Sequence, residues 1–365
     1  MSQKILFVIT NLNMGGAEKV TVNIIKSLAQ LDYKISIFLL KNEGVLISDL
    51  PKNVEIYYGG EGALKLNFWN IIIKLIKIIK QHDVVIGALE LLPTYLSFIC
   101  SRICGKKIIG WVHTDLQLYL ENKKWYEKYL AKLFYTKIKN IIFVSEGSKK
   151  SLQNICSDRV YNNWDVIPNA IDSEYYLNVV ERKDKPRYNL IWYGRYEKVK
   201  RIDFLLDVVK ILVEKEPRYR LLLIGYGSCE EQIKMKISSL DLSENITMLS
   251  RQTTLVPFLD SSDIFVLTSE YEGFGNVIVE AMARGLPIVS SDCPHGPKEI
   301  LDNGKYGVLI EKDDMNAFAS AIMNICSVNH IYFDLSKKSI TRAEKYHPNN
   351  ICLHWVEYLI KVNEL

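Results

Sequence analysis

The sequence predicts an α/β protein made of two parallel-sheet, Rossmann-like domains, and three observations support this prediction. Short apolar runs rich in β-branched residues alternate with longer amphipathic segments, which is the pattern of strand–helix–strand units with right-handed crossovers. The chain has 365 residues, more than the roughly 250–300 over which a single hydrophobic core grows. Its charge is also divided unevenly. Residues 1–170 hold 22 Lys/Arg and 14 Asp/Glu, a net charge of +8, and the remainder has a net charge of −4.

Strands and helices can be assigned in order from the hydrophobic periodicity. In the first half, the expected strands are residues 5–9, 35–40, 84–86, 107–112 and 141–144, and the expected helices are residues 17–31 and 66–81. In the second half, the expected strands are residues 190–193, 219–224, 246–248, 264–267 and 288–290, and the expected helices are residues 202–215, 230–240, 276–283 and 315–326. The helix over 202–215 ends before Pro217, because proline cannot continue it.

A domain boundary is expected near the middle of the chain. Residues 166–172, Val-Ile-Pro-Asn-Ala-Ile-Asp, and the polar stretch 181–187 separate a domain over residues 1–169 from one over residues 170–348. Residues 349–365 form a C-terminal segment, with a last helix over residues 350–362.

The composition excludes several classes of protein. With 48% apolar and 24% charged residues, the chain is neither disordered nor collagen-like nor a disulfide scaffold. Its seven cysteines are scattered, so free thiols are favoured over a zinc site or disulfides. The first apolar run is too short for a signal peptide, and no stretch of 18 uncharged apolar residues occurs. We therefore expect a protein of the reducing cytosol.

The first segment of chemical interest is residues 11–18, Asn-Leu-Asn-Met-Gly-Gly-Ala-Glu, between the first strand and the first helix. Gly15 and Gly16 let the backbone approach a ligand, and the N-terminus of a helix offers free N–H groups to an anion such as phosphate. A tight strand–helix turn explains the segment equally well. The spacing is not G-x-G-x-x-G, so no dinucleotide site is indicated.

The second segment is residues 193–201, Tyr-Gly-Arg-Tyr-Glu-Lys-Val-Lys-Arg, after another strand. Gly194 precedes Arg195, and Lys200 follows five residues later, so two cations can lie over one strand end and neutralise a diphosphate. A solvated charged loop is the alternative.

The third segment is residues 223–227, Leu-Ile-Gly-Tyr-Gly, at the end of the next strand. Gly225 and Gly227 can let a ligand lie flat against the backbone. Taken alone, this pair is better explained by an ordinary turn with a left-handed residue.

The most informative segment is residues 268–280, Thr-Ser-Glu-Tyr-Glu-Gly-Phe-Gly-Asn-Val-Ile-Val-Glu. Glu272 lies in the loop before an expected helix, and Glu280 lies about one turn inside that helix. Free N–H groups at Gly275 and Asn276 would receive a phosphate, while the loop carboxylate accepts a hydrogen bond from a sugar hydroxyl. Helix capping beside a surface carboxylate is the alternative, but it gives no reason for Gly-Phe-Gly.

Glu272 and Glu280, within Glu-Gly-Phe-Gly…Glu-Ala-Met-Ala-Arg-Gly, resemble the signature of the family 4 retaining glycosyltransferases. Supporting motifs arrive in the family's order at residues 15–18, 166–169, 194–200, 225–227, 291–300 and 303–304. The resemblance covers nearly the whole chain. It implies a GT-B fold, with two Rossmann-like domains facing a central cleft and the last helix crossing back to the first domain.

The resemblance also implies a role for each matching residue. Arg195 and Lys200 would bind the donor diphosphate and stabilise the departing nucleoside diphosphate without a metal ion or other cofactor. Glu272 would bind ring hydroxyls of the donor sugar, and Glu280 the ribose hydroxyls. His113, at a strand end of the first domain, resembles the histidine that faces the donor sugar, although a lone histidine is more often structural. The other residues placed at the donor are Gly15, Gly16, Gly194, Gly225, Gly227, Arg251, Gly273, Phe274, Gly275 and Asn276.

The sequence departs from the family pattern at three places. Asn276 stands where the family often has an apolar residue, and Arg201 where it often has glycine. Ser250 and Arg251 stand where a glycine commonly precedes the loop that binds the base. A uridine donor is the family's commonest choice and is expected here by analogy.

Two segments combine lysines with aromatic or isoleucine residues. Residues 68–80 place Lys74, Lys77 and Lys80 at three-residue spacing among isoleucines, and residues 122–137 interleave lysines with Trp125, Tyr129 and Phe134. Such segments suit an anionic membrane surface, and ordinary core helices with solvated lysines are the alternative. No nucleic-acid motif accompanies them.

These expectations together describe a retaining glycosyltransferase on the inner face of the cytoplasmic membrane. It would move a hexosyl or N-acetylhexosaminyl unit from a nucleotide sugar, with UDP as the expected nucleotide, to a lipid-linked saccharide in bacterial lipopolysaccharide, O-antigen or capsule synthesis. Two other functions share the fold. One is a non-hydrolysing nucleotide-sugar epimerase, and the other is a non-catalytic protein that binds nucleotide sugars.

Overall fold

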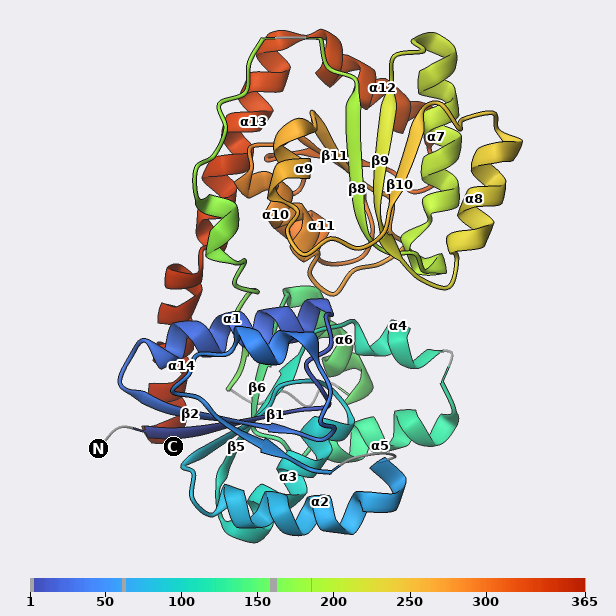
Figure 1. The fold of residues 1–365 in the computed structure, drawn as a ribbon. Coiled ribbons are helices and arrows are strands. Elements are labelled where there is room, and N and C mark those ends of the chain that lie inside the picture. Colours follow the sequence, from blue (N-terminus) through green and yellow to red (C-terminus); the bar gives the residue numbers. More distant parts are fainter. Residues whose placement is uncertain (1–2, 61–63, 122, 158–162, 185, 365) are drawn as a thin grey trace. The chain divides into compact units, whose positions relative to one another are not determined.

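The computed structural model describes residues 3–60, 64–121, 123–157, 163–184 and 186–364. The chain divides into two compact units, which Figure 1 colours along the sequence. Unit 1 contains residues 1–170 and 348–365, and unit 2 contains residues 171–347.

The described part of unit 1 contains a seven-stranded parallel sheet in the order β3-β2-β1-β4-β5-β6-β7. Its strands are β1 (Gln3–Ile9), β2 (Tyr33–Leu39), β3 (Glu55–Tyr58), β4 (Val84–Gly87), β5 (Lys107–Val112), β6 (Asn140–Phe143) and β7 (Trp164–Val166). Five consecutive residues of β1 are fully buried, because helices cover both faces of the sheet.

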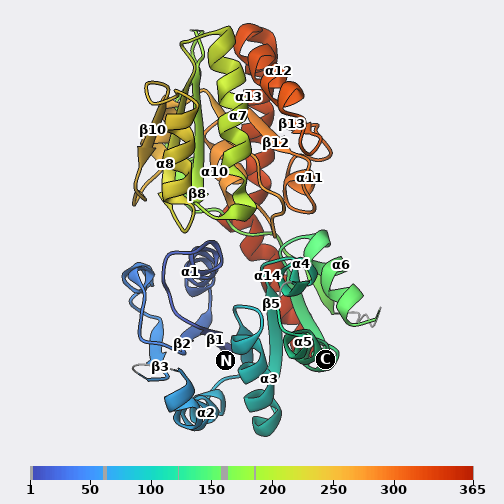
Figure 2. The same ribbon diagram turned by 90° about the vertical axis from the view of Figure 1, so that its right-hand side faces the viewer.

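The helices of unit 1 form the two outer layers of that sheet (Figure 2). They are α1 (Gly16–Ala29), α2 (Leu64–Ile79), α3 (Leu92–Cys104), α4 (Leu116–Glu121), α5 (Trp125–Tyr135), α6 (Glu146–Ile155) and α14 (Pro348–Glu364), with a 3-10 turn over Val45–Asp49. α2 packs on α3, and α3 packs on α5 through Tyr95 and Phe134, whose rings stack 4.3 Å apart. On α2, the apolar stripe of Ile71, Leu75 and Ile79 is buried against β1, β2 and β4.

The last helix, α14, belongs to unit 1 although it lies at the end of the chain, and it packs against α1. Its Trp355 is fully buried and contacts Trp111 of β5, with ring centroids 4.6 Å apart, and Phe7 of β1. At the far end of α14, Lys107 Nζ donates hydrogen bonds to the Val362 carbonyl at 2.9 Å and the Asn363 carbonyl at 2.7 Å. These contacts join the C-terminal segment to the sheet of unit 1.

The described part of unit 2 contains a six-stranded parallel sheet in the order β10-β9-β8-β11-β12-β13. Its strands are β8 (Asn189–Arg195), β9 (Arg220–Tyr226), β10 (Ile246–Leu249), β11 (Ile264–Leu267), β12 (Ile288–Ser291) and β13 (Val308–Ile310). Its helices are α7 (Ile202–Lys215), α8 (Glu230–Ser239), α9 (Val256–Ser261), α10 (Asn276–Ala283), α11 (Pro297–Ile300), α12 (Met315–Ser327) and α13 (Asn329–Ala343), with 3-10 turns over Ser173–Tyr176, Lys198–Lys200 and Glu344–Tyr346.

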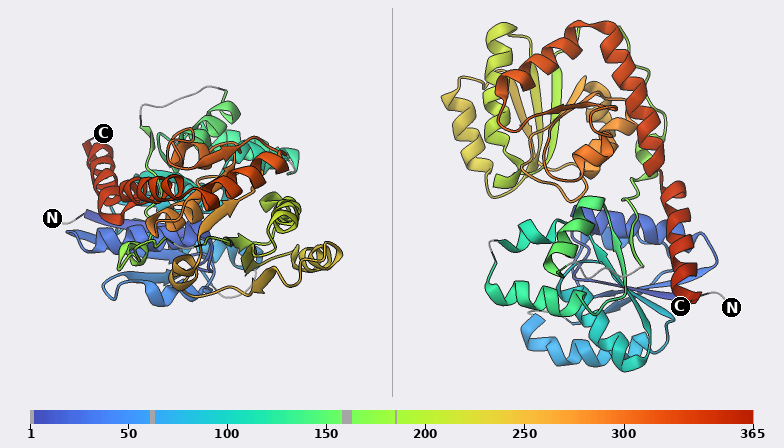
Figure 3. Two further views of the ribbon diagram at one scale, coloured as in Figure 1. Left: turned by 90° about the horizontal axis from the view of Figure 1, so that it is seen from above. Right: turned by 180° about the vertical axis from the view of Figure 1, so that it is seen from behind.

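Helices also form two layers on the sheet of unit 2. α7 packs on α8 and α12, and α10 packs on α13 (Figure 3). The core between the sheet and the layer of α7 and α12 contains the fully buried Trp192, Leu205 and Phe318. Doubly wound sheets of this kind are the Rossmann-like arrangement that the strand–helix alternation predicts.

Every strand and helix assigned from the sequence is present, with ends that shift by at most two residues. Three strands were not predicted, β3, β7 and β13, each only three or four residues long and at a sheet edge. Short edge strands give little alternation to detect. The unpredicted α3 has Pro93 in its first turn, and its apolar residues follow one another closely, which obscures the helical period.

Two further properties concern the cysteines and the helices. All seven cysteines are free, four of them buried and three half-buried. Among the residues that the structure describes, no helix has the length and apolar character needed to cross a bilayer.

Candidate functional site

The candidate site of unit 2 lies where the order of its strands reverses. β8 has β9 on one side and β11 on the other, and the chain builds outward in both directions from this pair. Ligands of open parallel sheets bind outside the carboxyl ends of the strands at such a switch point. Residues 194–201 include the end of β8 and the loop after it, and residues 268–276 follow β11, so two of the segments of chemical interest flank it.

Lys200 and Glu272 form an ion pair at this switch point. Lys200 Nζ lies 2.6 Å from Glu272 Oε1, and the Ser269 hydroxyl donates a hydrogen bond of 2.7 Å to the same oxygen. The side chains of Lys200 and Glu272 are 18% and 12% exposed. A largely buried carboxylate and a cation are thus held together at one edge of the sheet, where both can still be reached from solvent.

The two loops that carry this pair are bonded to each other through their backbones. The Glu270 N–H donates to the Val199 carbonyl at 2.7 Å, and the Thr268 hydroxyl lies 3.0 Å from the Lys200 carbonyl. Lys200 is therefore fixed at its Cα as well as at its ammonium group. Arg195, at the end of β8, is exposed, and its guanidinium forms no ion pair or hydrogen bond with the described residues.

Glu280 lies inside α10 and is only 7% exposed. The Tyr193 hydroxyl, at the end of β8, lies 2.9 Å from Glu280 Oε2 and 2.9 Å from the Val277 carbonyl. Burial and, to a smaller extent, the charge of Glu280 raise the pKa of Tyr193 well above its ordinary value, and the same two causes raise that of Tyr175. Both phenols therefore stay protonated and can donate to this carboxylate.

The Gly-Phe-Gly segment has a structural role. The ring of Phe274 is buried and meets that of Tyr346 edge-on at 5.5 Å. A Cβ atom on Gly296 would lie 1.9 Å from the Phe274 carbonyl oxygen, so the chain passes close behind this loop. Gly275 has a φ of 100° and is the N-cap of α10. Phe274 thus anchors the loop, while Gly273 and Asn276 on either side remain half-buried at the helix start.

The glycines of β8 and β9 are required by the packing of the two strand ends. Gly194 and Gly225 are paired in register, and a Cβ atom on Gly225 would lie 2.0 Å from the Gly194 carbonyl oxygen. A Cβ atom on Gly227 would lie 2.5 Å from the Tyr196 carbonyl oxygen. Close approach of one strand end to the other explains this spacing.

Arg251 lies at the β10 side of the same sheet edge. Its side chain is exposed, and its guanidinium carbon lies 5.3 Å from the ring centroid of Tyr226, at the end of β9. This cation–π pair presents a flat polar surface to solvent.

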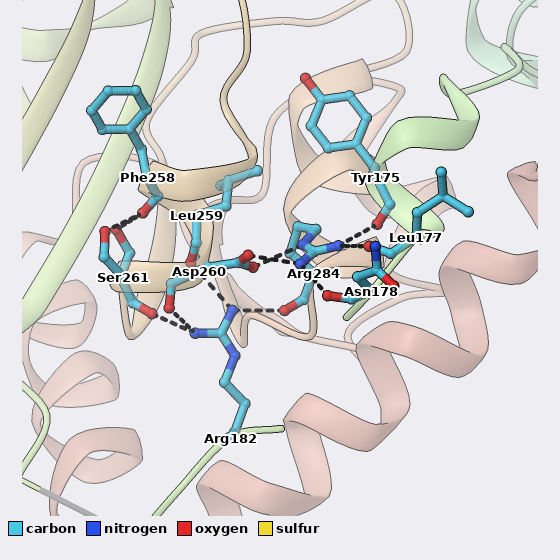
Figure 4. Close-up of polar contacts among 10 residues, drawn as sticks. Tyr175, Leu177, Asn178, Arg182, Phe258, Leu259, Asp260, Ser261 and Arg284 are labelled. Carbon is cyan, nitrogen blue, oxygen red and sulfur yellow. Dashed lines mark hydrogen bonds and ion pairs between the residues drawn. The ribbon is translucent and has the colours of Figure 1, made fainter. Parts of the chain in front are cut away.

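Two arginines, the buried Arg284 and the half-buried Arg182, form a network of hydrogen bonds beside the end of α10 (Figure 4). Arg284, only 1% exposed, forms a two-pronged ion pair with Asp260 at 2.8 and 2.7 Å. It also donates to the carbonyls of Tyr175, Leu177 and Asn178. Arg182 donates to the carbonyls of Leu259, Asp260, Ser262 and Arg284. The pair ties residues 175–182 to α9 and to the end of α10.

In unit 1, the Gly-Gly turn lies after β1 and caps α1. Gly15 is the N-cap of α1, and a Cβ atom on it would lie 2.2 Å from Glu18 Oε2. The helix therefore folds a carboxylate of its own first turn back over its N-terminus, which is favourable to the helix dipole. Gly16 beside it is exposed.

His113 follows β5, and sequence reasoning missed its neighbour Glu90, which follows β4. The backbone N–H of His113 donates a hydrogen bond of 3.2 Å to Glu90 Oε2. Both ring nitrogens of His113 are buried, and the polar group that acts on the ring is the Ala88 carbonyl. Burial lowers the pKa of His113 to about 3, against a smaller opposing effect of the Ala88 carbonyl, so its imidazole is neutral at pH 7.

The residues that sequence reasoning missed are of two kinds. Ser269 lies inside the segment over residues 268–280 and bonds Glu272 of the same loop. Tyr175 and Glu90 have no motif of their own and meet their partners on other elements. Glu90 could have been found by the strand-end argument, since it is a carboxylate after a central parallel strand. The described residues contain no group of three or more His, Cys, Asp or Glu side chains arranged to hold a metal ion.

The two parallel α/β units have the GT-B fold, and the family models that match them identify the chain as a glycosyltransferase. The chain belongs to the family 4 glycosyltransferases. Residues 14–175 match the family described as "Glycosyltransferase Family 4", and residues 177–345 match the family described as "Glycosyl transferases group 1".

Similar proteins cover the whole chain. An uncharacterized glycosyltransferase of Haemophilus influenzae is 27% identical over 97% of this chain and 99% of its own length. The Campylobacter jejuni N-acetylgalactosamine-N,N'-diacetylbacillosaminyl-diphospho-undecaprenol 4-alpha-N-acetylgalactosaminyltransferase is 24% identical over 98% of this chain and 100% of its own. The crystal structure of Anabaena HepE in complex with UDP and glucose has a TM-score of 0.82 at 19% identity, over 98% of this chain and 100% of HepE. The structural likeness establishes the fold.

Proposed function

We propose that this glycosyltransferase moves a hexosyl or N-acetylhexosaminyl unit, with retention of anomeric configuration, from a UDP-sugar to a lipid-linked saccharide during synthesis of a bacterial surface polysaccharide. The observation that carries the donor part is the Lys200–Glu272 pair, 2.6 Å apart at the switch point of unit 2. Arg195, exposed at the end of β8, supplies a second cation.

Each member of the pair suits a different part of a nucleotide sugar. An ammonium group has three N–H donors, so Lys200 can bond Glu272 and a phosphate oxygen at the same time. Glu272 has further lone pairs for the hydroxyls of the donor sugar. The donor can therefore bind without breaking the pair, and the charge of Lys200 is already in place when it arrives.

During sugar transfer, Lys200 and Arg195 would stabilise the leaving group. The bond between the anomeric carbon and the phosphate oxygen breaks, and the nucleoside diphosphate leaves with the electron pair. Lys200 and Arg195 stabilise the charge that develops on it, an effect worth about 10²–10³-fold in rate for one well-placed donor. The acceptor hydroxyl attacks the face that the phosphate leaves, which retains the configuration, and its proton passes to the departing phosphate.

UDP is the proposed nucleotide because proteins of this fold bind it. HepE has been solved with UDP and with UDP-glucose, and the pneumococcal O-GlcNAc transferase GtfA with UDP and GlcNAc. In this chain, Arg251 and Tyr226 offer a flat surface for a base at the β9–β10 side of the edge, and Glu280 lies on the β11 side for ribose hydroxyls.

The proposed acceptor is lipid-linked, and unit 1 would meet it at the inner face of the cytoplasmic membrane. On α2, Trp69 is 74% exposed beside the exposed Lys74 and Lys77, and on α5, Trp125 is 77% exposed beside Lys128. Phe134 does not share this exposure, because it stacks on Tyr95, and Asn122 lies outside the described residues. The Campylobacter relative and a Xanthomonas campestris mannosyltransferase are named for polyprenol-linked acceptors, and a Rhizobium meliloti relative for lipopolysaccharide core.

The donor proposal is tested by binding and turnover with a panel of nucleotides. UDP, UDP-glucose, UDP-galactose, UDP-N-acetylglucosamine, UDP-N-acetylgalactosamine and GDP-mannose are titrated by calorimetry, and slow release of UDP into water is followed for each sugar. We expect UDP to bind and one UDP-sugar to be hydrolysed. Glu272→Ala should abolish that turnover while UDP still binds, and Glu214→Ala, at an exposed position of α7, should change neither.

Failure of UDP and of all the sugars to bind would remove the proposed donor. Retained turnover in Glu272→Ala would remove the role given to that carboxylate. The two alternative functions give other results. An epimerase would convert the UDP-sugar into its epimer without an acceptor, which proton NMR detects, and a non-catalytic binder would bind without turnover of any sugar.

A further inference from the structure

Two buried tyrosines of unit 2, Tyr193 and Tyr175, bond a carboxylate of the candidate donor site, and the proposed function gives neither a role. The carboxylate is that of Glu280, which lies inside α10 and is only 7% exposed. Burying a carboxylate is costly unless the surrounding structure supplies hydrogen-bond donors. The two phenols are such donors, because burial raises the pKa of each hydroxyl and keeps it protonated.

Tyr193 approaches Glu280 from the sheet. It stands near the end of β8 and is 4% exposed, and its ring packs edge-on against Phe265 of β11, with ring centroids 5.4 Å apart. Its hydroxyl lies 2.9 Å from Glu280 Oε2 and 2.9 Å from the Val277 carbonyl in the first turn of α10. The packed ring therefore holds one carboxylate oxygen at a fixed distance from the strand.

Tyr175 approaches Glu280 from the 3-10 turn over Ser173–Tyr176, which packs on α10. It is 1% exposed, and its hydroxyl also forms a hydrogen bond with the Glu280 carboxylate. Arg284 donates to the Tyr175 carbonyl at 3.3 Å, and the tyrosine ring points away from that arginine (Figure 4). Because its backbone is fixed by the arginine, the position of the Tyr175 hydroxyl is fixed as well.

This arrangement suits a carboxylate that receives a ligand. A carboxylate can accept about four hydrogen bonds, so two phenols do not exhaust it. A side chain that is already ordered also binds more tightly, because a loose one would have to be immobilised when the ligand arrives. The two neighbouring hydroxyls of a ribose are donors of the kind that a fixed carboxylate can accept together.

We propose that Tyr193 and Tyr175 are positioning residues that orient Glu280 toward the ribose of a ribonucleoside diphosphate. The two phenols fix the carboxylate before the donor binds, so that it accepts the 2′- and 3′-hydroxyls together. This inference rests on the proposed function, which supplies the nucleotide and assigns the ribose to Glu280. The tyrosines act through Glu280 and so set the preference for ribose over a sugar that lacks these hydroxyls.

The test measures how much the two ribose hydroxyls add to nucleotide affinity. Calorimetry with the full chain compares UDP with 2′,3′-dideoxyuridine diphosphate, or GDP with its dideoxy analogue if UDP does not bind. The readout is the ratio of the two dissociation constants. Tyr193→Phe and Tyr175→Phe each keep the ring and lose the hydroxyl, and Glu280→Gln removes the charged acceptor. Tyr196→Phe is the matched control, because the buried Tyr196 hydroxyl bonds none of the described residues.

A hydrogen bond to a charged group is worth about tenfold or more in affinity, so the wild type should bind UDP at least about tenfold more tightly than the dideoxy analogue. Tyr193→Phe and Tyr175→Phe should each lower this ratio by about threefold or more, by weakening UDP alone. Tyr193→Phe should have no further effect in a chain that already carries Glu280→Gln, since the two changes act on one interaction. Tyr196→Phe should keep the wild-type ratio.

A purely structural role of the tyrosines would weaken UDP and the dideoxy analogue equally. An unchanged ratio in Tyr193→Phe and Tyr175→Phe therefore overturns the inference, and thermal unfolding shows which variants are folded. If one of them does not fold, the other decides. A wild type that binds both compounds equally also overturns the inference. Absence of binding by UDP and GDP would instead overturn the proposed function, and the inference with it.

Discussion

At the scale of single residues, the candidate donor site is built from charges that neutralise each other before any ligand binds. Lys200 and Glu272 are both largely buried, and an unpaired charge in either position would be costly. Pairing them keeps a cation and a carboxylate ready at one strand end. Glu280 is protected differently, by neutral donors on Tyr193 and Tyr175. The site thus holds two acidic side chains in two distinct environments.

His113 makes the stability of the fold depend on pH. Its pKa falls from 6.5 to about 3 on folding, so the unfolded chain binds a proton that the folded chain excludes between these values. The stability that the neutral ring provides is present above pH 6.5 and is lost as the pH falls toward 3, by up to about 1.4 kcal/mol per pH unit.

We therefore expect the free energy of unfolding of the wild type to fall more steeply between pH 6.5 and about 4 than that of His113→Gln. Urea unfolding at a series of pH values measures both slopes. His330→Gln, at an exposed position of unit 2, is the control and should follow the wild type. Parallel profiles for wild type and His113→Gln would contradict the assignment of a buried neutral ring.

The positions of some candidate site residues could be predicted from the sequence and those of others could not, for a physical reason. Arg195, Lys200, Glu272 and Glu280 stand in segments whose spacing alone places them at strand ends or a helix start. Glu90 has an ordinary local sequence, and its environment depends on α1 and β5, which are distant in the chain. Tertiary partners of this kind leave no periodic signal.

At the scale of elements, central strands and long helices follow directly from their apolar runs. α7 has the bounds that the sequence predicts, because its apolar residues recur at helical spacing and Pro217 follows it. Three edge strands, β3, β7 and β13, were not predicted. Edge strands can be short and only partly buried, so their apolar pattern is weak. The contacts of Arg182 and Arg284 between elements were not predicted either. Both arginines bond mainly to backbone carbonyls, and in the sequence alone they look like ordinary surface charges.

Arg284 should be among the most important residues for the stability of unit 2. Replacing it with alanine leaves Asp260 without its partner and three carbonyls, of residues 175, 177 and 178, without their donor. Breaking a buried pair in this way typically lowers stability by about 3–5 kcal/mol. Arg284→Ala should therefore lower the urea midpoint strongly.

Two further variants separate the causes. Arg284→Lys keeps the charge but not the planar fork, so it should recover only part of the loss. Arg218→Ala removes an arginine whose ion pair with Glu216 is exposed, and its midpoint should match the wild type. If Arg284→Ala also unfolds at the wild-type urea midpoint, the contacts of Arg284 drawn in Figure 4 do not stabilise unit 2.

At the scale of the whole molecule, the two units differ in charge as the sequence indicates. With α14 counted in unit 1, that unit has a net charge of +7 and unit 2 a net charge of −3. In unit 1, exposed basic and exposed aromatic side chains occur on the same helices. α2 and α5 each carry an exposed tryptophan among lysines, and both helices pack on α3. The buried stripe of α2 accounts for its isoleucines at core positions but leaves Trp69 and Ile73 in solvent.

This distribution predicts that the protein binds anionic vesicles through unit 1. Each lysine near an anionic surface contributes about 1 kcal/mol, roughly a fivefold change in affinity, and exposed tryptophans favour the interface. Reversing Lys124 and Lys128 to glutamate should weaken co-sedimentation with phosphatidylglycerol vesicles by more than tenfold, and Trp125→Ala should weaken it at high salt as well, where charge is screened. Lys215→Glu with Lys337→Glu reverses two exposed lysines of unit 2 and should leave binding unchanged. Equal losses of vesicle binding in both double variants would mean that net charge alone drives adsorption. If the wild type does not bind the vesicles at low salt, the proposed membrane association is wrong.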